Sequence, residues 1–147
     1  MIYTSYFNNY GRLFAANPNL VFISIAGKMP DYFNHNEILK YSKLAPNRDW
    51  WNVWHDKFNG RAESLDSQKF YIEKYYETVL NKLDPNEVKT ELLEMSDRRN
   101  VVLMCYEIPD KFCHRHIVSE WFRQNGIECG EHICPMLINN LFKLKNV

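Results

Sequence analysis

The residue types best suited to chemistry gather in one short stretch of the sequence, between Glu107 and Arg115. Glu107 directly follows an apolar run at residues 101–106, and Cys113, His114 and Arg115 begin six residues later, at the expected start of a helix. The first turn of a helix offers unpaired backbone N–H groups and the positive end of the helix dipole. Both favour a thiolate at Cys113 and an anionic ligand group at the same place. The stretch therefore predicts either an anion site or a reactive thiol, with Glu107 and Cys113 as the candidate catalytic residues.

Each of these residues also has a purely structural interpretation. His114 falls on the apolar face of the expected helix, where a hydrogen-bonded, half-buried histidine is common. Glu107 can pair with Arg115 as a structural ion pair, and Cys113 can serve as a small packing residue or in place of an N-cap. Cys105 is expected in the core of its strand. These alternatives stay open at the level of the sequence.

A tryptophan-rich helical segment predicts a surface for a ring-shaped ligand. Trp50 and Trp54 lie four residues apart on one stripe and are expected in the core. Trp51 and His55 fall beside that stripe, so they are the better candidates for stacking against a base or a sugar.

Three further ligand contacts are expected where strands end. Tyr6 ends the first expected strand, Lys28 follows the second, and His132 lies after the last. Ligands of open α/β sheets bind next to the carboxyl ends of the strands. Lys28 can contact a phosphate there, although a solvated lysine is the default interpretation.

The spacing of cysteine and histidine does not favour a metal site. Cys129-x-x-His132-x-Cys134 could supply ligands together with residues 113–116, but the sequence contains no Cys-x-x-Cys pair. The strand expected after Gly126 would also point alternate residues to opposite faces. We therefore expect no bound metal and no cofactor.

Apolar periodicity and turn signals predict the elements that must position these residues. We expect strands at residues 2–7, 20–25, 101–106 and 127–129, and helices at residues 47–58, 66–83 and 113–125, with another starting at Asp84-Pro85. Asp66 or Ser67 is expected to cap the second of these helices, and Gly126 to end the last. Continuous apolar strands suit a sheet that is covered on both faces. The fold class is therefore α/β: a three-layer, Rossmann-like domain with a small, mostly parallel sheet flanked by helices.

Composition and absent motifs exclude several classes of protein. The 147 residues, which we expect to form a single domain with an unassigned tail from about residue 134, carry 18 basic and 18 acidic side chains. This balance argues against a nucleic-acid partner, and no apolar run is long enough to span a membrane. The start of the chain lacks an export signal, and the four cysteines suit reduced thiols, so we expect a cytoplasmic protein. Glycine-rich dinucleotide and phosphate loops and the hydrolase elbow are absent.

The sequence resembles the domain of unknown function 488 family. The resemblance rests on Cys-Tyr-Glu at residues 105–107 and on Cys-His-Arg at residues 113–115, and it extends over most of the chain up to about residue 134. It implies an α/β fold and a site near Glu107 and residues 113–115, but no established reaction. Other members carry Asp-Val-Arg on the second strand, where this chain has residues 24–26, so any role of that acid or arginine is lost or moved.

Together these features predict a small phosphorylated or nucleotide-like ligand at the carboxyl ends of the strands. Arg115 and the helix start, with His114, would hold the anion, while Tyr6 and Trp51 would flank a ring. Glu107 would bind a ribose-type hydroxyl or act as acid and base in hydrolysis or transfer at a glycosidic or phosphate centre. The alternatives are a non-catalytic ligand sensor or sequestering protein, and thiol redox or transfer chemistry at Cys113. The oligomeric state does not follow from the sequence.

Overall fold

The computed structural model describes residues 1–32, 37–108 and 110–131. Within these residues five parallel strands form one sheet in the order β3-β2-β4-β1-β5. The strands are β1 (Ile2–Tyr6), β2 (Val21–Ser24), β3 (Leu39–Lys40), β4 (Val101–Cys105) and β5 (Cys129–Glu131). The helices are α1 (Tyr10–Ala16), α2 (Arg48–Phe58), α3 (Leu65–Thr78), α4 (Pro85–Met95) and α5 (His114–Gln124), with short 3-10 turns η1 (Phe7–Asn9), η2 (Ser42–Leu44) and η3 (Leu80–Lys82).

The central strands end together at one edge of the sheet. Tyr6 at the end of β1 lies opposite Cys105 at the end of β4, and Ser24 at the end of β2 lies opposite Met104. Every residue of β2 and β4 is buried, which agrees with their continuous apolar sequences. The segments that follow these strands therefore emerge side by side.

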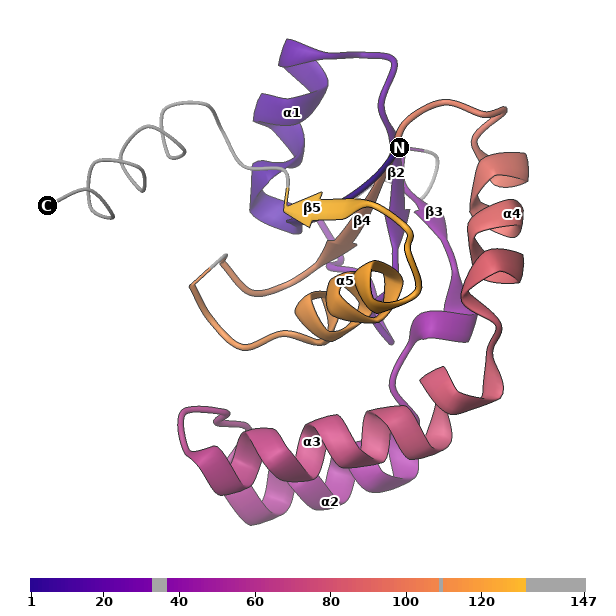
Figure 1. Ribbon diagram of the computed structural model, residues 1–147. Helices are drawn as coiled ribbons and strands as arrows, with labels where there is room; N and C mark the ends of the chain where they lie inside the picture. The colour runs from indigo at the N-terminus through magenta and orange to yellow at the C-terminus, as the bar shows by residue number, and fades with distance from the viewer. Residues whose placement is uncertain (33–36, 109, 132–147) are drawn as a thin grey trace, which may run out of the picture.

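The sheet is the middle layer of a three-layer α/β fold. On one face, Leu13 of α1 packs in a core with Phe22 and Val102. On the other face, a larger core joins the alternate residues of the same strands to α4 and α5 (Figure 1). No helix in the described ranges is both long and apolar enough to cross a membrane.

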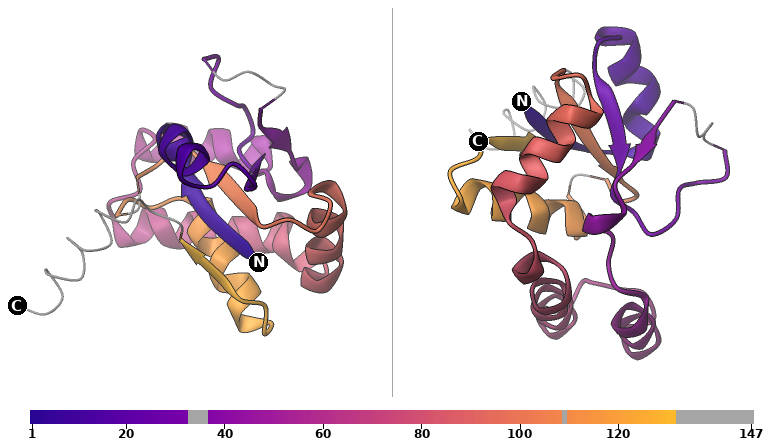
Figure 2. Two further views of the ribbon diagram at one scale, coloured as in Figure 1. Left: turned by 90° about the horizontal axis from the view of Figure 1, so that it is seen from above. Right: turned by 90° about the vertical axis from the view of Figure 1, so that its right-hand side faces the viewer.

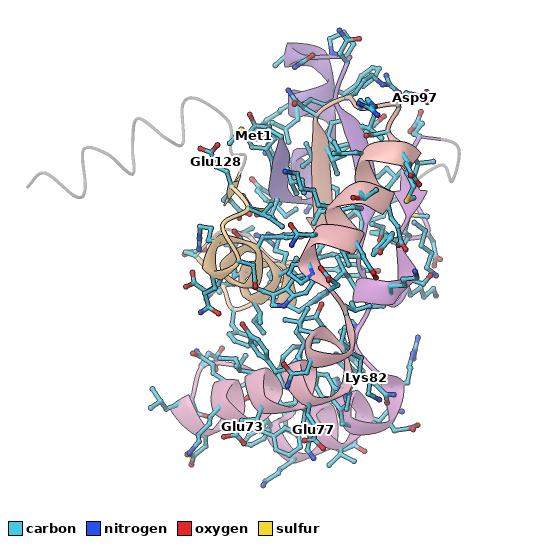
Figure 3. All side chains as sticks on the ribbon, turned by 45° about the vertical axis from the view of Figure 1, so that its right-hand side comes forward. Met1, Glu73, Glu77, Lys82, Asp97 and Glu128 are labelled. Carbon is cyan, nitrogen blue, oxygen red and sulfur yellow. The ribbon has the colours of Figure 1, made fainter. Side chains whose placement is uncertain are left out.

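Helices α2 and α3 form a pair that lies beyond the carboxyl edge of the sheet. Figure 2 shows the two helices end-on and next to each other, below the strands. Tyr71 of α3 packs edge-on against Trp50 and Trp54 of α2, at ring-centre distances of 4.9 and 5.0 Å. The Tyr75 hydroxyl donates a hydrogen bond to the carbonyl of Leu44, 2.6 Å away. The outer side of α3 carries exposed residues that include Glu73 and Glu77 (Figure 3).

Most of the expected elements are confirmed, and three details are wrong. Ser64, not Asp66 or Ser67, caps α3, because its hydroxyl accepts the N–H of Ser67. That helix ends at Thr78 and gives way to η3, instead of continuing to residue 83. The last strand begins at Cys129, two residues later than expected.

Candidate functional site

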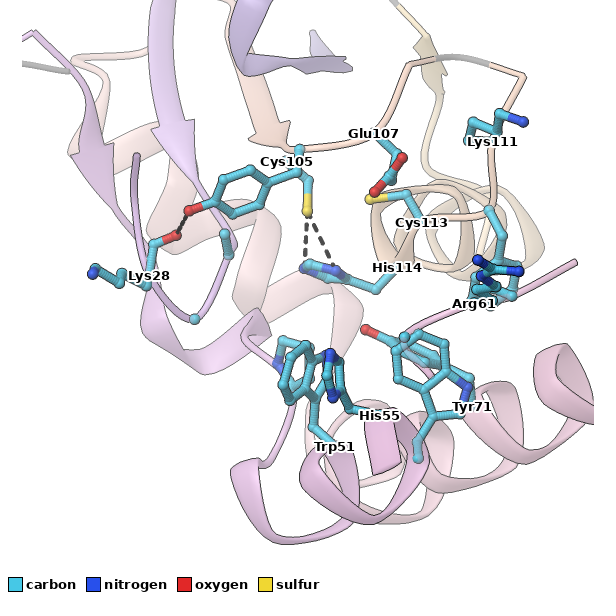
Figure 4. Close-up of a pocket in the computed structure, with 18 of the residues that line it drawn as sticks. Lys28, Trp51, His55, Arg61, Tyr71, Cys105, Glu107, Lys111, Cys113 and His114 are labelled. Atoms are coloured by element: carbon cyan, nitrogen blue, oxygen red, sulfur yellow. Dashed lines mark hydrogen bonds between the residues drawn. The ribbon is translucent and has the colours of Figure 1, made fainter. Parts of the chain in front are cut away.

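A cavity of about 720 Å³ lies where the carboxyl ends of β2 and β4 face the α2–α3 pair. Its walls are the segment after β2 (residues 26–28), the segment after β4 (residues 105–107), the start of α5, one face of α2 and the turn between α2 and α3. The volume falls within the range of small-molecule sites. Figure 4 shows the side chains that converge on it. Its position agrees with the rule that places ligands beyond the strand ends.

The walls carry more positive than negative charge, although the whole chain is neutral. Glu107 belongs to these walls, and its side chain is exposed. The cations are Lys28, Arg48, Arg61 and Lys111, and the carboxylates are Glu63 and Glu107. All four cations are exposed, and although Lys28 pairs with Asp31 at 3.7 Å, exposed side chains of this length can adjust to a ligand. Of these four cations only Lys28 was predicted as a ligand contact, because exposed charged residues carry no apolar periodicity that would single them out.

Trp51 and His55 form the aromatic wall of the cavity, as their place beside the Trp50–Trp54 stripe predicts. Their rings are stacked, with centres 5.1 Å apart and planes 22° apart. Trp50 and Trp54 are both buried in the core, which confirms that part of the interpretation. Trp51 is only half-buried, so the stacked pair offers a flat surface to a ring-shaped ligand.

Gly60 allows the ring of His55 to keep this position. Gly60 has a φ of +67°, and an added Cβ would lie 2.9 Å from Cδ2 and 3.0 Å from Nε2 of His55. Both the backbone conformation and the close ring disfavour any larger residue.

We expect Gly60→Ala to unstack His55 and to destabilise the protein by about 1 kcal/mol, because alanine is strained at positive φ. Thermal unfolding measures the stability, and the ring-current shift of the His55 protons in NMR spectra measures the stacking. Gly11→Ala is the control, since a Cβ there meets nothing within 4 Å and alanine favours a helix. This substitution should raise the free energy of unfolding instead of lowering it. Unchanged chemical shifts of the His55 protons in Gly60→Ala would contradict the conclusion that Gly60 permits the stacking of His55.

Two thiols and an imidazole lie together in the floor of the cavity. Cys105 ends β4, Cys113 precedes α5, and His114 is the first residue of that helix. The Cys105 Sγ lies 3.5 Å from Nδ1 of His114, and the donor atoms of the three residues all lie within 4.8 Å of one another. Nε2 of His114 is 2.8 Å from the carbonyl oxygen of Ile25. A carbonyl can only accept, so Nε2 carries a proton, and Nδ1 is the ring nitrogen nearer to the Cys105 sulfur.

The cluster favours one thiolate at Cys113. Burial opposes the charge, but hydrogen bonds from Cys105 and His114, together with the positive charges of His114 and Arg115, hold the pKa of the Cys113 thiol well below its usual value. Burial and the neighbouring Cys113 sulfur raise the pKa of the Cys105 thiol well above its usual value. Cys105 is buried in the core of its strand, as expected, and it also lines the cavity.

Arg115 does not line the cavity. Its side chain is 0% exposed, and it forms a two-pronged ion pair with Glu131, with Nε and Nη2 at 3.0 and 2.8 Å from the carboxylate oxygens. Thr4 donates to the same carboxylate at 2.6 Å. The pairing of Glu107 with Arg115, one of the structural interpretations, is not formed. Glu107 faces the cavity, whereas Arg115 ties α5 to β5.

Of the three ligand contacts expected at the strand ends, Lys28 alone is found in the cavity wall within the described residues. Tyr6 is buried at the end of β1 and is not part of the cavity wall. Lys28 belongs to the wall, and its backbone carbonyl accepts a hydrogen bond from the Tyr106 hydroxyl. His132 lies outside the described residues, as does Cys134.

Comparison with known proteins matches the chain to a protein family. Residues 28–126 match the family model described as "DUF488-N3a: Active DUF488-N3 subclade". The matched segment covers about two thirds of the chain and contains the α2–α3 pair, β4 and α5, and with them nearly all of the cavity wall. No curated protein and no solved structure matches the chain.

Proposed function

The chain belongs to the DUF488 family, in the subclade described as active, and on this premise we propose that its cavity binds a small phosphorylated or nucleotide-like ligand. One observation carries the proposal: cations, a stacked aromatic pair and a free carboxylate line the same cavity. Each of these groups recognises a different part of such a ligand.

The phosphate is held by the cations of the wall and not by Arg115, which Glu131 already occupies. Arg48 starts α2 and Arg61 lies in the turn after it, so the two cations line the cavity from opposite ends of that helix. Arginine binds phosphate through paired, charge-assisted hydrogen bonds. Lys28 and Lys111 add positive charge from the strand-end segments.

The ring of the ligand stacks on Trp51 and His55. A stacked contact of this kind tolerates different bases, because every base presents a flat π face. It fixes the orientation of the ring while the cations hold the phosphate. The sugar or linking group then lies between the two, towards the strand ends.

Glu107 is the proposed catalytic carboxylate. It forms no ion pair with any residue in the described part of the chain, and it lines the cavity just beyond the end of β4. A carboxylate in this place suits hydrolysis or transfer at a glycosidic or phosphate centre, where a proton must be moved. The description of the subclade as active favours this enzymatic version over a sensor.

A thermal-shift screen tests the ligand class. We expect a nucleoside monophosphate to stabilise the wild type more than the nucleoside, a ribose phosphate or inorganic phosphate alone. At a hundredfold excess over Kd the gain is about 2.7 kcal/mol, or about 5–10 °C in Tm. Arg48→Gln combined with Arg61→Gln should abolish the shift given by the phosphorylated ligands.

The control is Lys82→Gln, which removes an exposed cation outside the cavity wall and should leave every shift unchanged. A monophosphate shift that survives the double substitution would overturn the proposed anion site. The absence of any shift in the wild type would overturn the ligand class itself.

A further inference from the structure

The cluster of Cys105, Cys113 and His114 has the spacing of a metal-binding site. A tetrahedral zinc ion with a sulfur at about 2.3 Å and a nitrogen at about 2.0–2.1 Å places these two atoms about 3.6 Å apart. The Cys105 Sγ and His114 Nδ1 are 3.5 Å apart, and the Cys113 donor lies within 4.8 Å of both. The three donors are therefore close enough to share one ion once their side chains rotate towards it.

The hydrogen bond of His114 to the backbone suits a metal ligand. The Nε2–H of His114 donates to the carbonyl of Ile25, so Nδ1 is the nitrogen left for a metal, and the Cys105 Sγ lies beside the ring, 3.5 Å from Nδ1 and 3.9 Å from Nε2. A ligating histidine nearly always fixes its tautomer through such a bond on the far nitrogen. Tyr75 packs edge-on against the ring, with centres 5.6 Å apart, and holds its plane.

The surroundings suit a soft, doubly charged ion. Cys105, Cys113 and His114 are only 4%, 6% and 5% exposed, so little water competes for the donors. Two thiolates and a neutral imidazole balance the charge of one Zn²⁺, which lowers the cost of burial. Hard ions such as Mg²⁺ prefer oxygen ligands and are disfavoured here.

We propose that Cys105, Cys113 and His114 bind one Zn²⁺ ion, with a fourth coordination position open to the cavity. Three protein ligands and an open position are the arrangement of catalytic zinc sites, whereas structural sites are closed by four. All three residues line the cavity that Glu107 also lines (Figure 4). A water molecule or a ligand oxygen can occupy the open position.

This site replaces the one considered from sequence spacing. That candidate combined Cys129, His132 and Cys134 with the start of the last helix. In the fold Cys129 begins β5, whereas Cys105 approaches α5 from β4. The zinc proposal does not depend on the proposed phosphorylated ligand, because metal binding can be measured without any ligand.

Cobalt substitution tests the site on the full chain. Reduced, metal-free protein is titrated with Co²⁺, and we expect thiolate-to-cobalt charge-transfer absorption and strong visible bands from a tetrahedral ion at one equivalent. Zn²⁺ should displace the cobalt, and both the charge-transfer absorption and the visible bands should then disappear. The intensity of the charge-transfer band reports the number of thiolates in the wild type, so it does not depend on any variant folding.

Cys105→Ser, Cys113→Ser and His114→Gln should each weaken Zn²⁺ binding by more than about a hundredfold. Cys129→Ser is the matched control: it changes a buried thiol outside the cluster and should retain one ion per chain. The proposal is overturned if the wild type shows no charge-transfer band, if the ligand variants bind normally, or if only Cys129→Ser loses the ion. A reduced wild type that binds no metal but reacts rapidly at Cys113 would instead support thiol chemistry.

Discussion

Replacing Arg115 with methionine is expected to lower the free energy of unfolding by about 3 kcal/mol. The guanidinium is fully buried, and its removal leaves the Glu131 carboxylate, which is only 20% exposed, without its cation. Breaking a buried pair from one side costs more than the pair contributes, because an uncompensated charge remains. In a chain of this length the loss corresponds to a fall of about 6–12 °C in Tm.

Arg123→Met is the matched control for this prediction. Arg123 lies on the same helix and pairs with Glu120, but both side chains are more than half exposed. Exposed pairs contribute little, and the further bond of Arg123 to the Cys129 carbonyl is long at 3.3 Å, so Tm should fall much less than in Arg115→Met. Adding Glu131→Gln to Arg115→Met should recover part of the loss, since the unpaired charge is then gone. An unchanged Tm in Arg115→Met would show that the pair does not stabilise α5 against β5.

Because Arg115 stabilises the fold through its pair with Glu131, it is unsuitable for testing ligand binding. If Arg115 held the anion, as its place at the start of the helix predicts, its removal would abolish binding. A variant that partly unfolds loses every ligand, so such a result would say nothing about the phosphate. Arg48 and Arg61 are exposed, and their substitution separates the anion site from the stability of the fold.

Features that depend on neighbouring residues could be predicted from the sequence. Asn47 and Asp84 cap their helices through bonds to backbone N–H groups two or three residues away, and Gly126 takes the positive φ expected of a helix end. The general position of the site also follows, because parallel strands end at one edge. Trp51 and His55, which helical spacing separates from the buried stripe, both line the cavity, and their contact with a ligand stays a prediction.

Features that depend on distant partners could not be predicted. The sequence shows that α5 starts near Cys113, but the rotation of that helix about its axis decides that His114 faces the cavity and Arg115 faces β5. The partner of Arg115 is Glu131, which is sixteen residues further along the chain. The sequence does not show on which side of α5 the intervening turn places this residue. β3 has only two residues, both exposed, and therefore gives no apolar pattern.

Glu107→Gln is expected to lower turnover of the stabilising ligand by about a hundredfold to ten-thousandfold while leaving its binding intact. Glutamine keeps the shape and the hydrogen-bonding oxygen of the side chain but can neither accept nor deliver a proton at neutral pH. Glu107 is exposed and forms no ion pair within the described residues, so the fold should tolerate the change. Product formation is followed by chromatography with mass detection, and binding by thermal shift.

Glu63→Gln is the control, because it removes a second carboxylate from the wall of the same cavity and should leave turnover unchanged. Retained turnover in Glu107→Gln would remove Glu107 from the catalytic role. If the wild type instead binds the ligand tightly and releases it intact on denaturation, the protein is a sensor or a sequestering protein.

Because zinc would occupy the floor of the same cavity, the assay is run on metal-free and zinc-loaded protein. Turnover that requires zinc and Glu107 together would assign the carboxylate to the metal-bound water, whereas turnover without zinc would assign it to the ligand directly.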